Sequence, residues 1–232
     1  GAAGTGKTAL VTQAKNAYCM DFDNGMLTAR NLQDKFTPLR HEIEFDTYKD
    51  YNLTAPTAWM KAKQKITRIA EKAHRGTWEF DALVIDSITG MGRQCQNQIF
   101  FDAGLLGQTL GNQGLKLYGH IVADLENYIQ IITALPCLTI VVTHELPLTI
   151  GAGESAETSL MPRIIGTKLP SKLPEFFDEV WYTMVKKQGA EFIASWKPRY
   201  HRESRTRSGK FQELKHNDIG LAGLLKEINF NV

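Results

Sequence analysis

The chain has 232 residues, of which 43% are hydrophobic and 22% are charged, as in typical soluble globular proteins. This length suits one α/β domain with an ample core, and a formal net charge of +2 excludes a strong global basic field. Three cysteines without a C-x-x-C spacing argue against a disulfide framework and favour a reducing compartment. Since we find neither a membrane-length apolar run nor a signal peptide, we expect a cytoplasmic protein without a membrane partner.

The first eight residues, GAAGTGKT, match the phosphate-binding loop pattern G-x-x-x-x-G-K-T. Its glycines let backbone N–H groups point at phosphate oxygens, and the helix that follows adds a favourable dipole for anions. Lys7 is expected to reach the β- and γ-phosphates and the Thr8 hydroxyl to bind Mg²⁺. The alternative is a glycine-rich loop that only closes a helix. We assign nucleotide binding to six loop residues: Gly1, Gly4, Thr5, Gly6, Lys7 and Thr8.

Apolar runs and their spacing predict the elements that follow. Apolar residues at helical spacing predict helices at 7–13, 57–74 and 117–134, and short apolar runs predict strands at 17–20, 43–46, 82–85 and 138–142. Residues 180–185 and 191–196 predict antiparallel strands around a turn at 187–189. The sequence therefore predicts an α/β fold: a mostly parallel sheet with helices on both faces and a C-terminal antiparallel edge hairpin.

Two segments fit neither pattern. Residues 90–114 are rich in Gly, Gln and Asn, and residues 146–174 in Gly, Pro and Ser. Each directly follows an apolar strand, so we predict long irregular connections at strand C-terminal ends, where open α/β sheets place ligand contacts. Because the chain begins inside the phosphate-binding loop, we expect residues 1–232 to form a single domain that lacks the strand before that loop.

Carboxylates end two of the predicted strands. Asp86 follows Leu-Val-Ile, the position from which an acidic residue completes the Mg²⁺ shell opposite Thr8; alternatively, it caps the next segment. Asp21 and Asp23 end an earlier strand, and alternate residues of an extended segment point the same way. A carboxylate there can orient a water for attack on the γ-phosphate, but Asp, Asn and Gly at this point also suit a plain turn.

His144 ends the strand 138–142 together with Thr143. Either side chain is suited to sensing the γ-phosphate and passing its state to the following segment; the alternative for His144 is a hydrogen-bonded histidine at a strand end. From Met161 onward there are 13 Lys and Arg against 8 Asp and Glu. The densest basic run, residues 197–207, suits DNA phosphates, a neighbouring subunit's nucleotide, or simply a solvated turn.

The order of these motifs resembles the RecA-like ATPases, most closely the compact phage-encoded RecA-like proteins of the single-strand-annealing kind. In that family the strand after the phosphate-loop helix ends in Asp-x-Glu, whose Glu activates water; here Asp23 takes that place, a shorter carboxylate. The resemblance matches Arg205 and Arg207 to cations that touch the adjacent subunit's γ-phosphate. It puts residues 90–114 and 146–174 in the positions of the DNA-binding loops, the second carrying Arg163, Lys168 and Lys172.

The resemblance implies an ATP- and Mg²⁺-dependent ATPase that handles DNA strands in recombination or single-strand annealing. Its partners would be single-stranded DNA and further copies of the chain in a ring or filament, in the cytoplasm of a bacterial host. The catalytic residues would be Asp23, Lys7, His144, Arg205 and Arg207, with the metal held by Thr8 and Asp86. Two alternatives remain: a hexameric helicase-type motor, and a DNA-annealing module whose nucleotide site controls assembly with little turnover.

Overall fold

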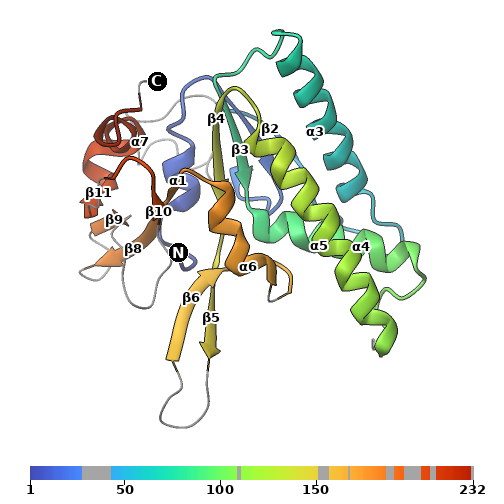
Figure 1. Cartoon of the computed structure of the whole chain (residues 1–232). Helices are drawn as coiled ribbons and strands as arrows, with labels where there is room; N and C mark the ends of the chain where they lie inside the picture. Colours follow the sequence, from blue (N-terminus) through green and yellow to red (C-terminus); the bar gives the residue numbers. More distant parts are fainter. Residues whose placement is uncertain are drawn as a thin grey trace.

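A parallel sheet forms the centre of the molecule (Figure 1). The computed structural model describes residues 1–27, 43–108, 111–150, 157–166, 168–186, 191–195, 205–209 and 213–230. The sheet consists of β1 (Ala17–Asp21), β2 (Glu44–Thr47), β3 (Ala82–Asp86) and β4 (Leu138–Val142), in the order β2-β1-β3-β4. All neighbouring strands are parallel, which confirms the predicted fold class and all four predicted strands. The register aligns Asp21 with Asp86 and Asp86 with Val142, so the residues that follow these strands meet at one edge.

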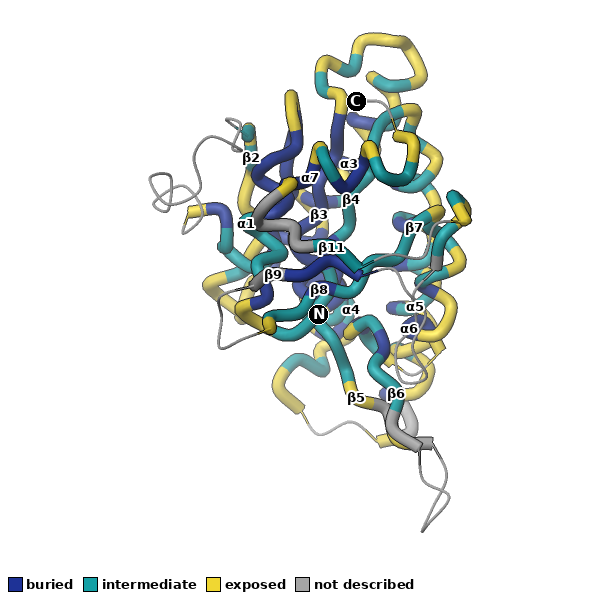
Figure 2. Tube along the Cα trace, turned by 90° about the vertical axis from the view of Figure 1, so that its left-hand side faces the viewer, coloured by how far each residue is buried: buried dark blue, intermediate teal, exposed yellow. Residues whose placement is uncertain are grey.

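Helices cover both faces of this sheet, with α3, α4 and α5 on one side and α1 and α7 on the other (Figure 1). Alternation along β1 explains the two layers, because successive side chains point to opposite faces. Tyr18 and Met20 pack with α3, α4 and α5, whereas Ala17 and Cys19 pack with α1 and α7. Figure 2 shows the buried positions in the central strands. None of the described helices is long and apolar enough to cross a membrane.

The predicted helices are confirmed as α1 (Lys7–Val11), α3 (Ala58–His74) and α5 (Asn112–Thr133). In α3 the apolar residues at helical spacing, Trp59, Ala62, Ile66 and Ile69, are buried against the sheet. The helix begins where it does because the Asp50 carboxylate accepts hydrogen bonds from the first free backbone amides, at Thr57 and Ala58.

The prediction of an irregular connection at 90–114 is wrong for most of that segment, because residues 88–102 form the helix α4 (Ile88–Asp102). Gly90 permits close packing rather than loop formation, because a Cβ atom on it would lie 2.6 Å from the Asp23 carboxylate. A Cβ atom on Gly92 would make an ordinary contact with Ile164 at 3.4 Å. Residues Met91 and Cys95 are fully buried, so tertiary packing overrides the low helix propensity of a Gly- and Asn-containing segment.

The prediction of a second irregular connection, at 146–174, is also wrong. This segment contains most of an antiparallel hairpin of β5 (Glu145–Ile150) and β6 (Glu157–Pro162), then α6 (Lys168–Lys172) and the 3₁₀ helix η3 (Leu173–Phe176). Both strands of a two-stranded hairpin are edge strands, which is why prolines at 147 and 162 are tolerated. The hairpin extends away from the body of the molecule (Figure 1).

The predicted C-terminal hairpin is confirmed as β8 (Tyr182–Lys186) and β9 (Glu191–Ser195); its predicted turn at 187–189 lies outside the described residues. In the part of the chain that the structure describes, β9 also pairs with β11 (Glu213–Lys215), giving a small antiparallel sheet separate from the parallel one. The prediction that the hairpin extends an edge of the parallel sheet is therefore wrong. Nearby, β7 (Glu179–Val180) pairs with β10 (Arg205–Thr206), and α7 (His216–Glu227) follows β11.

Candidate functional site

The loop of residues 1–8 leads into α1, which begins at Lys7, and it contacts the small antiparallel sheet. Gly4 and Gly6 have φ values of 75° and 78°, a left-handed conformation that favours glycine. The Thr5 hydroxyl lies 2.8 Å from the hydroxyl of Thr183 on β8. A Cβ atom on Gly1 would lie 2.1 Å from the Thr183 carbonyl oxygen, so glycine is required there for the strand to approach.

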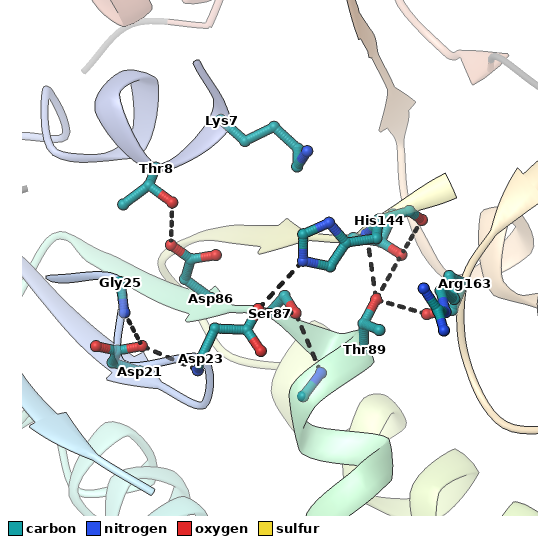
Figure 3. A network of polar contacts seen from close by, with 12 residues as sticks. Lys7, Thr8, Asp21, Asp23, Gly25, Asp86, Ser87, Thr89, His144 and Arg163 are labelled. Carbon is teal, nitrogen blue, oxygen red and sulfur yellow. Dashed lines mark hydrogen bonds and ion pairs between the residues drawn. The ribbon is translucent and has the colours of Figure 1, made fainter. Parts of the chain in front are cut away.

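Lys7, at the start of α1, directs its ammonium group at this loop. Its Nζ donates to the carbonyl oxygen of Gly1 at 2.9 Å and also to that of Ala2. Burial lowers the pKa of Lys7, while the carboxylates of Asp86 and Glu145 act in the opposite direction. Lys7 thus occupies the cradle that the loop forms, and it faces the same space as Asp86 and His144 (Figure 3).

Asp86 ends β3 and accepts a hydrogen bond from the Thr8 hydroxyl at 2.7 Å. Its side chain is almost completely buried, with the residue 3% exposed. Burial raises the pKa of Asp86 to about 6. The neighbouring carboxylates of Asp21 and Asp23 also raise this pKa, whereas the Thr8 hydrogen bond and the charge of Lys7 lower it. A cation beside Asp86 would relieve this cost of burying charge.

The chemistry of this pair fits Mg²⁺. A hydroxyl and a carboxylate oxygen that already lie together are hard ligands, and Mg²⁺ usually takes only one or two protein carboxylates together with water and phosphate oxygens. Within the described residues there is no group of three or more His, Cys, Asp or Glu side chains that would form an all-protein metal site. Thr8 and Asp86 would therefore hold the metal jointly with a nucleotide.

The buried charge of Asp86 should reduce stability at neutral pH in the absence of metal. The folded state binds the Asp86 proton more tightly than the unfolded chain, so the free energy of unfolding falls as pH rises from 3.8 to about 6, and this loss persists above pH 6. We expect Asp86→Asn to raise the free energy of unfolding at pH 7 in EDTA by about 1–3 kcal/mol. Thermal melting measures this gain, which should shrink below pH 5.

The matched control for that prediction is Asp21→Asn. Asp21 is completely buried, and its carboxylate accepts hydrogen bonds from the backbone N–H groups of Asp23, Gly25 and Met26. Asparagine keeps one acceptor oxygen but puts an amide nitrogen, which cannot accept, in the place of the other. At least one buried N–H group therefore loses its acceptor, and this variant should melt lower than the wild type. Equal melting of Asp86→Asn and wild type at pH 7 would show that the Asp86 charge carries no such cost.

The two carboxylates after β1 have different roles. The hydrogen bonds of Asp21 build the turn, so the plain-turn interpretation is correct for Asp21. Asp23 instead lies beside the end of β3, where its Oδ2 accepts a hydrogen bond from the Ser87 hydroxyl at 2.6 Å. The same oxygen lies 3.3 Å from Nε2 of His144 (Figure 3). The expectation that both carboxylates face the crevice is therefore wrong for Asp21.

The first turn of α4 holds this arrangement together. Ser87 is the N-cap of α4 and accepts a hydrogen bond from the Gly90 amide at 3.1 Å, so Ser87, not Asp86, caps this helix. Ser87 donates its own proton to Asp23, which fixes one carboxylate oxygen. His144, rather than Thr143, contacts Asp23, since the Thr143 hydroxyl donates to the His144 carbonyl at 2.9 Å.

The cations expected at DNA and at a neighbouring nucleotide lie just after β6, on α6, and on or just after β10. The Arg163 backbone is joined to His144 by a hydrogen bond of 2.7 Å, and its side chain is exposed. Lys168 is exposed on α6, and Lys172 forms an ion pair with Glu126 at 3.7 Å. Arg207 donates to Asp178. Arg205 lies in β10, and its side chain is outside the described set.

Sequence analysis missed Thr183 as a contact of the phosphate-binding loop and Ser87 as the partner of Asp23. Thr183 follows the loop by 178 residues, and no local pattern links them. Ser87 carried a usable signal, since a serine between a strand and a helix is a frequent N-cap. The structure brings together Lys7, Thr8, Asp86, Asp23 and His144, all taken from the loop or from the C-terminal ends of β1, β3 and β4.

Comparison with known proteins agrees with this geometry. A family model described as an AAA domain matches residues 1–213. The comparison with curated proteins gave no match. A parallel sheet between helices, with a phosphate-binding loop opening the helix α1, is the architecture of a P-loop ATPase-type domain. The chain belongs to the AAA domain family.

Proposed function

We propose that the protein binds ATP with Mg²⁺ and hydrolyses it at the site formed by residues 1–8 and the ends of β1, β3 and β4. One observation carries this proposal: Lys7, the Thr8–Asp86 pair and the Asp23–His144 pair converge on one space in front of the loop (Figure 3). A phosphate chain needs a cationic group, a metal needs oxygen ligands, and an attacking water needs a base. The site provides all three.

Each residue would do a separate part of the work. When bound, the Mg²⁺ nucleotide supplies the phosphoryl group and the charge neutralisation that transfer requires. Lys7 would release the Gly1 and Ala2 carbonyls and pair with phosphate oxygens. Asp23, held through one oxygen by Ser87, would orient a water and accept its proton. The His144 Nε2 lies 3.3 Å from Asp23 Oδ2, where an N–H group can donate to the carboxylate, and His144 would sense the change.

We further propose that the protein acts on single-stranded DNA as a homo-oligomer, in strand annealing or recombination. Arg163, whose side chain is exposed, is hydrogen-bonded to His144 through its backbone N–H group. Lys168 follows on α6 and is also exposed. Cations of this kind suit backbone phosphates. In this proposal the nucleotide site controls DNA binding through the β5–β6 hairpin, which lies between His144 and Arg163.

The test is ATP turnover with and without Mg²⁺ and with and without single-stranded DNA, together with DNA binding at several salt concentrations. We expect Mg²⁺-dependent turnover that DNA increases and DNA binding that weakens with salt. Unwinding of duplex DNA would favour the helicase-type motor. DNA binding with negligible turnover would favour the annealing module, and no DNA binding in any nucleotide state would overturn the DNA role.

We propose that Arg205 and Arg207 act on the nucleotide of a neighbouring copy. The double variant Arg205→Ala with Arg207→Ala should leave ATP affinity within about threefold while turnover falls about 10³-fold or more, as for other arginine fingers. Loss of the exposed Arg207–Asp178 pair should cost little stability, so melting temperature is the control. Normal turnover by the double variant at high protein concentration would exclude this role.

A further inference from the structure

The β5–β6 hairpin has an unusual root beside the nucleotide site. Its last paired residues are Glu145 and Pro162, so the next pair toward the body of the protein is His144 and Arg163. In an antiparallel ladder every second pair exchanges two backbone hydrogen bonds. Pro162 has no N–H group, so Glu145 and Pro162 are not such a pair, whereas His144 and Arg163 are in position to be one. One of the two is present, from the Arg163 N–H to the His144 carbonyl oxygen at 2.7 Å.

A side chain from α4 takes the place of the second bond. The His144 N–H donates to the Thr89 hydroxyl at 3.1 Å, and that hydroxyl donates to the Arg163 carbonyl oxygen at 2.6 Å (Figure 3). Thr89 is buried, with 8% of its surface exposed. One hydroxyl from a helix thus bridges the two strands at the hairpin root, accepting from one and donating to the other.

The same helical turn holds the catalytic end of the site. Ser87 donates to Asp23, and Gly90 lies so close to Asp23 that a Cβ atom there would reach the carboxylate. Thr89 lies between these two residues in sequence. Residues 86–90 therefore contact the Thr8 hydroxyl, the Asp23 carboxylate and the hairpin root within one turn of chain.

We propose that the Thr89 hydroxyl transmits the state of the nucleotide site to the β5–β6 hairpin. This rests on the proposed function, because it assigns the output of the same site. Any shift of α4 against Asp23 or His144 moves the bridging hydroxyl, and that movement changes the pairing of His144 with Arg163. Closely packed groups respond to such shifts by changing partners rather than by stretching. Thr89 is a positioning residue in this scheme, since it reaches the nucleotide only through other groups.

The test compares the wild type with Thr89→Val, which keeps the shape of the side chain and removes the hydroxyl, and with Thr89→Ser, which restores it. Thr133→Val is the matched control, because the Thr133 hydroxyl bonds carbonyls of its own helix, at Ile129 and Gln130. The measurements are affinity for a non-hydrolysable ATP analogue with Mg²⁺, melting temperature, and hydrogen exchange of backbone amides in β5 and β6 with and without the analogue.

The analogue should change the rate of amide hydrogen exchange in the hairpin by about fivefold or more in three proteins: the wild type, the Thr89→Ser variant and the Thr133→Val variant. Fivefold is the lower end of typical coupling between sites. In Thr89→Val the analogue should still bind, with affinity within about threefold, but the exchange rates should be equal in the two states. A purely structural role for Thr89 would instead speed exchange in both states and preserve the nucleotide-dependent difference.

Two results overturn the proposal separately from the proposed function. One is a bound analogue that leaves hairpin exchange unchanged in the wild type, a measurement that does not depend on the folding of any variant. The other is a Thr89→Val protein whose hairpin responds as the wild type does. Failure of the wild type to bind the analogue would instead remove the nucleotide site, and with it both proposals.

Discussion

Lys7→Ala is expected to lower ATP turnover by at least about 100-fold, because one preorganised charged donor in a catalytic site contributes about this much. The Lys7 ammonium lies inside the cradle of residues 1–8, on the Gly1 and Ala2 carbonyls. Removing it leaves the phosphate oxygens without the cation that the loop positions. Steady-state phosphate release measures the loss, and analogue binding shows how much of it arises from affinity.

Lys15→Ala is the control for this variant. Lys15 is exposed and lies shortly after α1, so its loss changes the net charge equally without touching the cradle. This variant should turn over ATP at the wild-type rate. Turnover near wild type in Lys7→Ala would remove residues 1–8 as the catalytic nucleotide site, whatever else they bind.

Asp23→Asn is expected to lower the turnover number about 10²–10⁴-fold, the usual contribution of a general base. ATP affinity should stay within a few fold, because Thr8 and Asp86, the proposed metal ligands, are untouched. The asparagine side-chain oxygen still accepts the Ser87 hydrogen bond, so the fold around α4 is preserved. A single-turnover measurement separates this loss of chemistry from any change in binding.

Asp102→Asn provides the control, since Asp102 ends α4 on the exposed surface, where it accepts a hydrogen bond from Gln98. If Asp23→Asn hydrolyses ATP normally, the base is another carboxylate of this site. Glu145 is then the next candidate, because its charge acts on Lys7 and it accepts a hydrogen bond from Tyr182. Glu145→Gln would decide between them.

Local sequence patterns were sufficient for the sheet, for three helices and for the order of the site residues. Residues 82–85 form a fully apolar run, and they became the buried strand β3 followed by Asp86. The loop pattern of residues 1–8 predicted glycines that let the backbone wrap with its N–H groups pointing inward. Gly4 and Gly6 adopt the left-handed conformation, which a residue without Cβ adopts readily. Such features depend on a few adjacent residues, which is why sequence alone reveals them.

Local composition failed where close packing decides the structure. Glycine and asparagine in residues 90–114 suggested a loop, but Gly90 is needed where α4 approaches Asp23. Prolines in residues 146–174 suggested irregular chain, but a two-stranded hairpin has free edges that accept them. In both segments the residue type reflects a neighbour that lies far away in sequence.

The sequence by itself determined the G-x-x-x-x-G-K-T loop, the apolar strands of a parallel sheet and the carboxylates that end two of these strands, because each is encoded by contiguous residues. Only the tertiary structure decided which carboxylate of the Asp21/Asp23 pair enters the site. Asp21 lies beneath three backbone N–H donors, whereas the Asp23 side chain meets Ser87 and His144. The same is true of Thr89, whose hydroxyl gains its place only because the parallel register brings the ends of β3 and β4 together.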